Sequence, residues 1–146
     1  MNPVFVDTSV LIAAEDVGDA ELYAATLNWL DLLWKTRSGR TGSQALCEFY
    51  DQVTSAPEPL PQGDARAAIR RYQTWNPWKT DAATLETAWA VQARHQLAFG
   101  DCLAVACAQH SGCDQMLSLH LPRGAQFGGV TVVHPLHAAA PVEAAA

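Results

Sequence analysis

The stretch at residues 4–12, Val-Phe-Val-Asp-Thr-Ser-Val-Leu-Ile, constrains the fold more than any other part of the chain. Its first three residues are apolar and favour a short buried strand. A second apolar run begins at Val10, and Thr8 or Ser9 is suited to cap a helix there. Asp7 therefore stands where a strand ends and a helix begins. In open α/β sheets, ligands bind along that edge.

A second aspartate occupies an equivalent position later in the chain. Gly100 and Asp101 open an expected helix whose body, residues 103–108, is small and apolar on nearly every side. Because helix starts and strand carboxyl ends share one rim of a doubly wound sheet, Asp7 and Asp101 can converge. Two carboxylates in proximity repel unless a cation neutralises them, which a divalent metal ion would do. Each aspartate can equally be only an N-cap or a first-turn residue, favoured by the helix dipole.

The rest of the chain alternates between expected helices and strands. Helices are expected over residues 19–37, 44–54, 64–72 and 81–96, with Asp19, Ser43 and Asp81 as capping residues. Residues 40–42 are expected to form a short connector or a weak edge strand. Further strands are expected at 115–119 and 130–133, the last preceded by a glycine-rich loop at 124–129. This pattern predicts a single α/β domain over residues 1–137, with a central, mainly parallel sheet flanked by helices. The alanine-rich residues 138–146 are expected to form a flexible tail.

Composition indicates an ordinary globular protein. The chain has 146 residues, 49% of them hydrophobic and 16% charged, which suits one domain with a substantial core. Without a membrane-spanning run or a signal segment in the sequence, we expect a cytoplasmic protein that does not associate with a membrane. The cysteines lack Cys-x-x-Cys spacing and are expected to be buried free thiols: Cys47, Cys102, Cys107 and Cys113.

The net charge of −6 argues against a broad surface for gripping nucleic acid. It is compatible with a compact acidic metal site, or with a basic partner that covers such a site. Most positive charge is arginine, which can make local phosphate contacts or simply remain solvated: Arg37, Arg40, Arg66, Arg70, Arg71, Arg94 and Arg123. Three tryptophans are candidates for a partner groove or a homodimer contact as well as for the core: Trp29, Trp34 and Trp78.

Four parts of the chain, in order, resemble the motifs of the PIN domain family: residues 4–12, residues 44–50 with Glu48, residues 99–104 with Asp101, and the closing strands at 112–118 and 127–135. The resemblance covers residues 3–136 and is closest to the VapC-type toxins of bacterial toxin–antitoxin pairs. It implies a ribonuclease that depends on Mg²⁺ or Mn²⁺, in which a metal-activated water attacks a phosphodiester. It also implies an RNA substrate, a cognate antitoxin and a homodimer as partners.

This resemblance assigns roles to individual residues. Asp7 and Asp101 would be metal ligands, and Glu48 would be a third ligand or would orient a metal-bound water; all three would be catalytic. On a helical wheel, Glu48 falls away from the apolar stripe of its helix, so it can face solvent or line a cleft. Hydroxyl groups that could contact a ligand or a substrate phosphate are those of Thr8, Ser9 and Ser118.

The chain departs from the family at the fourth acidic position. The family usually has a Ser-Glu-Asp-like run after the penultimate strand, whereas this chain has Ser118-Leu119-His120. A neutral imidazole suits Mn²⁺ or a softer metal better than Mg²⁺ and brings no negative charge. His120 is therefore either a metal ligand or a strand-end histidine bonded to a backbone carbonyl. The closing motif also departs, with His134 in place of asparagine and Leu136 in place of an aromatic residue.

Three functional hypotheses follow. The first is an active endoribonuclease, the toxin of a type II toxin–antitoxin pair. The second is a catalytically weakened PIN fold that binds RNA or an antitoxin, because His120 replaces a carboxylate. The third, a different enzyme acting on phosphate esters, is less favoured. A haloacid-dehalogenase-like phosphatase would need Asp-x-Asp where Asp7-Thr8-Ser9 stands, and a P-loop enzyme would need a Gly-x-x-x-x-Gly-Lys run that the sequence lacks.

Overall fold

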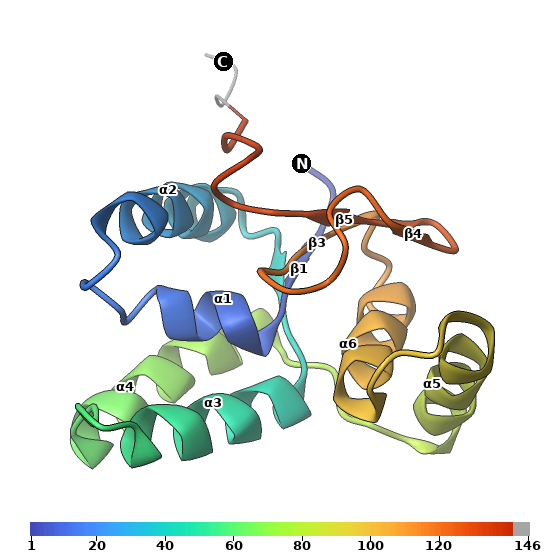
Figure 1. Ribbon diagram of the computed structural model, residues 1–146, viewed down its shortest axis with the longest axis horizontal. Helices are drawn as coiled ribbons and strands as arrows, with labels where there is room; N and C mark the ends of the chain where they lie inside the picture. The colour runs from blue at the N-terminus through green and yellow to red at the C-terminus, as the bar shows by residue number, and fades with distance from the viewer. Residues whose placement is uncertain (142–146) are drawn as a thin grey trace.

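A five-stranded sheet forms the centre of the domain in the computed structural model, which describes residues 1–141 (Figure 1). The strands run in the order β2-β1-β3-β5-β4. They are β1 (Val4–Val6), β2 (Gly39–Arg40), β3 (Gln115–Leu117), β4 (Gln126–Phe127) and β5 (Val130–Val133). All neighbouring pairs are parallel except β4 with β5. The predicted α/β class with a mainly parallel sheet is therefore confirmed.

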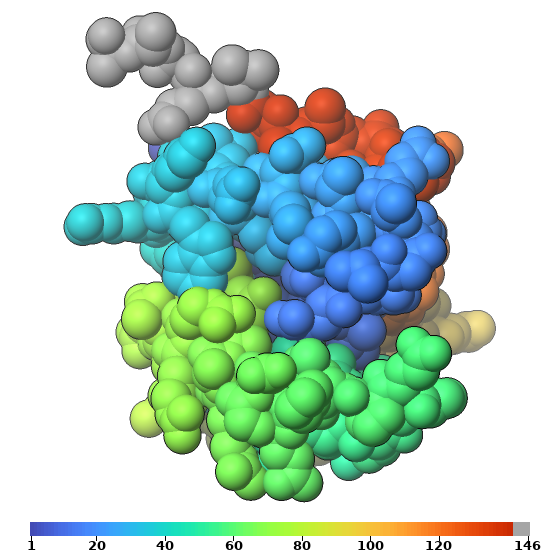
Figure 2. All heavy atoms as spheres, turned by 90° about the vertical axis from the view of Figure 1, so that its left-hand side faces the viewer, coloured from blue at the N-terminus to red at the C-terminus, as the bar shows by residue number. Residues whose placement is uncertain are grey.

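Helices pack on both faces of this sheet. One face carries α1 (Thr8–Ala13), α2 (Ala20–Thr36), α3 (Ser43–Ser55) and α4 (Gln62–Tyr72), which η1 (Gln73–Trp75), a single 3₁₀ turn, extends. The other carries α5 (Ala82–His95) and α6 (Phe99–His110). Figure 2 views the first side, where α2 lies above α1, and α3 and α4 lie below it. Each helix of residues 1–141 is too short or too polar to cross a lipid bilayer.

Alternation along β1 connects the two cores. Val4 and Val6 point into the core formed with α1 to α4, whereas Phe5 points into the core formed with α5 and α6. Since successive side chains of a strand face opposite sides of the sheet, three residues suffice to anchor both layers. This burial fixes β1 in the interior of the sheet, between β2 and β3, and thereby fixes where the chain emerges at Asp7.

Several local predictions were wrong. The glycine-rich loop contains a strand, β4, because Gly128 adopts a positive φ of 61° and lets the chain turn back to pair with β5. Ser43 is the first residue of α3 instead of its cap, since Gly42 holds the extended N-cap conformation. Of the cysteines expected to be buried, Cys47 is exposed, whereas the other three are buried and all four are free thiols.

The start of the alanine-rich tail remains attached to the domain. The indole N–H of Trp29 donates a hydrogen bond of 2.8 Å to the backbone carbonyl of Ala138, and Ala138 and Ala140 pack against the core. The prediction of a flexible tail from residue 138 is therefore wrong for the first residues of that segment. Residues 142–146 lie outside the described part of the chain, and for them the tail stays a prediction.

Candidate active site

Asp7 emerges at the carboxyl end of β1 and is itself the N-cap of α1. Its Oδ1 accepts hydrogen bonds from the backbone N–H groups of Ser9 at 3.0 Å and Val10 at 3.4 Å. The prediction that Thr8 or Ser9 caps this helix was wrong, because both lie within its first turn. The extended backbone of the strand ends at the aspartate, which places its carboxylate over the free amides of the turn.

The carboxylate of Asp7 is almost completely enclosed. The residue is only 3% exposed, and this burial raises its pKa above the ordinary value of 3.8. Neighbouring hydroxyl groups, a backbone amide and a histidine oppose the shift without overcoming it. A buried carboxylate whose charged form is disfavoured is a position that a bound cation would stabilise.

Glu48 reaches the same region from α3. Thr8 Oγ1 donates a hydrogen bond of 2.8 Å to Glu48 Oε2, and Gln44 Nε2 donates one of 3.2 Å to Oε1. The side chain is half-buried and lines a cleft, which is the second of the two orientations that the helical wheel allowed. Thr8, a predicted substrate contact, thus uses its hydroxyl hydrogen to hold Glu48 in place.

Asp101 and His120 form a direct pair at the mouth of the cleft. Asp101 lies in the first turn of α6, and His120 follows β3. His120 Nε2 lies 2.5 Å from Asp101 Oδ1, and the two side chains are 52% and 25% exposed, respectively. Burial lowers the pKa of His120, but the hydrogen bond and charge of Asp101, with the charges of Asp7 and Glu48, raise it overall. A histidine whose protonated form is favoured by the neighbouring carboxylates therefore stands where the resemblance expects an aspartate.

Two serine hydroxyl groups hold the loop that follows β3 in place. Ser9 Oγ accepts a hydrogen bond of 3.0 Å from the Leu119 amide while its hydroxyl contacts Asp7. The fully buried Ser118 Oγ accepts hydrogen bonds from the amides of His120 at 3.4 Å and Leu121 at 3.2 Å. Ser9 and Ser118, both predicted to contact substrate, thus organise the loop that carries His120.

The predicted site residues line one open cleft of about 540 Å³: Asp7, Thr8, Ser9, Glu48, Asp101 and His120. Ser118 lies just behind it, at the end of β3. Within residues 1–141, however, no three acidic, histidine or cysteine side chains lie close enough together to hold a metal ion as they stand. The oxygen donors suit a hard divalent cation, and burial of Asp7 favours one, but the bond to His120 engages Asp101.

The family model of the PIN domain matches residues 4–119, from β1 to the residue before His120. The chain belongs to the PIN domain family. This confirms the resemblance seen in the sequence, and the matched span contains Asp7, Glu48 and Asp101 but stops short of the histidine.

Solved structures share the PIN fold of this chain. VapC20 of Mycobacterium tuberculosis, described as a toxin that cleaves the sarcin-ricin loop, is 23% identical with a TM-score of 0.60, covering 77% of this chain and 86% of its own. VapBC2 of Rickettsia felis, solved bound to a DNA fragment from its promoter, is 11% identical with a TM-score of 0.63, covering 90% and 97%. Comparison with curated proteins finds no match.

Sequence reasoning missed the direct bond between Asp101 and His120. It treated the two residues separately, as a metal ligand and as either a ligand or a partner of a backbone carbonyl. The available signal was that both were placed on the same rim of the sheet, where an acid and an imidazole can meet. The structure shows that they do.

Proposed function

We propose that this PIN domain is a metal-dependent endoribonuclease and the toxin component of a type II toxin–antitoxin pair. The observation that carries the proposal is that Asp7, Glu48 and Asp101, from three separate parts of the chain, line a single cleft. The fold likeness to VapC20 and to VapBC2 supports it. The substrate is RNA, and the protein acts in the cytoplasm, without membrane association.

Each acidic residue has a distinct part in this proposal. Asp7 and Asp101 would hold Mg²⁺ or Mn²⁺, which when bound supplies an activated water and stabilises charge on the phosphate. Glu48, oriented by Thr8, accepts a proton from the attacking water or fixes its position.

A second candidate function rests on the contact between His120 and Asp101. Because a protonated His120 neutralises Asp101, it competes with a cation for that carboxylate. A PIN domain in this state would bind RNA or its antitoxin and cleave poorly. His120 could alternatively turn its neutral imidazole to a metal, in which case Mn²⁺ would be preferred to Mg²⁺.

The acidic cleft also suggests how a partner would inhibit the enzyme. A lysine or arginine side chain of a cognate antitoxin is complementary to the three carboxylates and could occupy the position of the metal ion. We further propose a homodimer as the form of the isolated toxin, which sedimentation of the purified chain would test. A short antitoxin-like open reading frame beside the gene would favour the toxin assignment.

The activity is tested by incubating the purified protein with structured RNA and Mn²⁺ or Mg²⁺. We expect cleavage that Asp7→Asn abolishes, with a loss of at least about a hundredfold if a principal metal ligand is removed. Asp51→Asn, which removes an exposed carboxylate from the same helix as Glu48, is the matched control and should cleave normally. RNA that survives both metals would instead favour the binding protein.

His120→Asp separates the two candidate functions. Restoring a carboxylate should increase Mg²⁺-dependent cleavage if the histidine weakens a metal position. His120→Asn removes the imidazole without adding a negative charge. It is the control for the effect of breaking the hydrogen bond between His120 and Asp101. If neither variant differs from the wild type in the presence of Mg²⁺, the position has no part in metal binding.

A further inference from the structure

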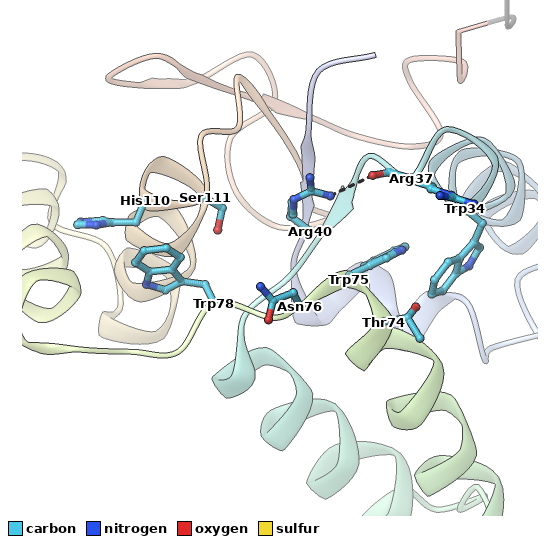
Figure 3. A pocket seen from close by; sticks show the side chains of 9 residues that line it. All are labelled: Trp34, Arg37, Arg40, Thr74, Trp75, Asn76, Trp78, His110 and Ser111. Atoms are coloured by element: carbon cyan, nitrogen blue, oxygen red, sulfur yellow. Dashed lines mark hydrogen bonds between the residues drawn. The ribbon is translucent and has the colours of Figure 1, made fainter.

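A second cleft, of about 730 Å³, lies at the β2 edge of the sheet and shares no lining residue with the candidate active site. Figure 3 shows Trp34 and Trp75 on one side of it, Trp78 and His110 on the other, and Arg40 between them. Arg37 also lines it. We call this the tryptophan–arginine cleft and define it by these six residues.

Its aromatic walls are held rigidly. Trp34, half-buried, lies against Trp75 with ring centroids 4.4 Å apart. Trp78, also half-buried, lies 5.5 Å from His110, and its indole N–H donates a hydrogen bond of 2.8 Å to Thr84 Oγ1. Trp34 also stacks with Tyr72, with ring centroids 5.8 Å apart. Each half-buried ring is thus packed against at least one other ring, and the part of it that lines the cleft is a surface on which a planar ligand can stack.

The cleft is also a local concentration of positive charge in an acidic protein. Arg37 is exposed, in a left-handed conformation at the end of α2, and Arg40 is half-buried in β2. Arg40 Nη1 donates to the carbonyls of Arg37 at 3.2 Å and Gly39 at 2.8 Å, which fixes one end of its guanidinium. Among residues 1–141, neither arginine forms an ion pair with a carboxylate, and no acidic residue lines the cleft. Both charges remain available for an anion.

The position of the cleft relates it to the candidate active site. Asp101 lies in the first turn of α6 and His110 ends it, so these two residues are roughly 14 Å apart along the helix axis at about 1.5 Å per residue. A small cavity between α3 and α6 is lined by Glu48, Gly100 and Gly42. Gly42 in turn forms a parallel bridge with Trp78. An extended strand of several nucleotides is longer than this separation.

We propose that the tryptophan–arginine cleft binds single-stranded RNA, with a base stacked on Trp34 or Trp78 and its phosphate against Arg37 and Arg40. The cleft holds a part of the substrate strand away from the scissile phosphate, so this inference rests on the proposed ribonuclease function. A pairing of stacked aromatic faces with unpaired arginines is the chemistry by which proteins hold unstructured strands. Binding of RNA at this one positively charged cleft is also consistent with the acidic net charge of the whole chain.

Binding is measured separately from cleavage, by fluorescence anisotropy of a labelled, unstructured oligoribonucleotide with a chelator present. The double variant Arg37→Asn with Arg40→Gln removes both charges, and asparagine tolerates the left-handed backbone at residue 37. We expect at least about a tenfold loss of affinity, and a fall of about 1.4 in the slope of log affinity against log salt, since each lost contact to a single strand contributes about 0.7. Arg66→Gln, a charge removed from the exposed face of α4, is the matched control and should bind RNA as the wild type does.

Trp34→Leu tests the stacking independently of charge. Loss of one stacked base should weaken binding about fivefold or more without changing the salt slope. Circular dichroism on every variant identifies any that fail to fold. If Trp34→Leu does not fold, the double arginine variant still tests the inference. Unchanged affinity and salt slope in the arginine double variant would overturn the inference. So would loss of antitoxin binding with RNA binding intact, because the cleft would then be a protein-docking site.

Cleavage assays with Mn²⁺ on the same variants separate this inference from the proposed function. If the wild type binds RNA through the two arginines but never cleaves it, the inference that the cleft binds RNA is supported and only the nuclease assignment is wrong. If the wild type cleaves and the arginine double variant binds and cleaves equally well, the nuclease stands and the cleft inference fails.

Discussion

Asp7 stabilises a helix and is at the same time buried where its charge is disfavoured. As the N-cap of α1 it satisfies two backbone amides, which contributes about 1 kcal/mol to stability. Burial nevertheless raises its pKa. The folded state therefore binds more protons than the unfolded state in the pH range just above 3.8, the ordinary pKa of the group, and stability falls as pH rises through that range.

Replacing this charge should stabilise the metal-free protein. Asparagine caps helices as well as aspartate does, so Asp7→Asn keeps the cap and removes the buried charge. We expect its Tm at neutral pH to exceed that of the wild type by a few degrees, and the difference to shrink as the pH falls toward 3.8. Thermal denaturation monitored by circular dichroism across this range measures it. If Asp7→Asn is less stable than the wild type at every pH, burial does not destabilise the charged form of the Asp7 carboxylate.

At the scale of secondary-structure elements, β2 depends on a glycine. A Cβ atom at Gly39 would overlap the indole ring of Trp75, which is only 6% exposed and cannot move outward without losing its burial. Gly39→Ala should therefore destabilise the fold by roughly 1–3 kcal/mol, measured by urea denaturation. Gly63→Ala is the matched control, since nothing lies within 4 Å of the new methyl group in α4. It should be neutral or stabilising by up to about 1 kcal/mol, and equal destabilisation by both changes would contradict this reading of β2.

The elements that could be predicted are those whose signal is local. The strand-to-helix transition at Asp7 and the cap of α5 by Asp81 follow from apolar runs and capping residues, and both are found. The strand β4 could not be predicted in this way. Its two residues, Gln126 and Phe127, form a strand only because they pair with β5 after the turn at Gly128. The pattern of side chains along the sequence contains little information about the pairing of two strands as short as this.

The candidate site shows the same limit at finer detail. Topology predicts that residues following β1 and opening α6 share a rim, and Asp7, Glu48 and Asp101 do line one cleft. It does not predict which hydrogen bonds their side chains make, because these depend on rotamers and on neighbours from other elements. Thr8 bonded to Glu48, and His120 bonded to Asp101, are contacts between residues 40 and 19 positions apart. Neither the helical nor the strand periodicity of the sequence relates two residues that are so far apart in the chain.

At the scale of the whole molecule, the candidate site exists only in the folded chain. Asp7 follows β1, an interior strand of the sheet, Glu48 comes from a helix on one face of the sheet, and Asp101 comes from a helix on the other. The unfolded chain separates these carboxylates and would bind a divalent ion weakly. A ligand that binds only the folded state must stabilise it, in proportion to how far its concentration exceeds its dissociation constant.

Metal addition should therefore raise the stability of the entire domain. At a concentration of Mn²⁺ about a hundredfold above its dissociation constant, the gain is about 2.7 kcal/mol, or several degrees in Tm for a domain of this size. Asp7→Asn should lose most of this rise although it is more stable without metal, and the exposed Asp31→Asn should retain it because Asp31 lies on α2, away from the cleft. Differential scanning calorimetry with and without Mn²⁺ measures all three proteins. An equal rise in the wild type and both variants would indicate diffuse screening of the acidic surface, and no rise in any of them would contradict a metal site between these carboxylates.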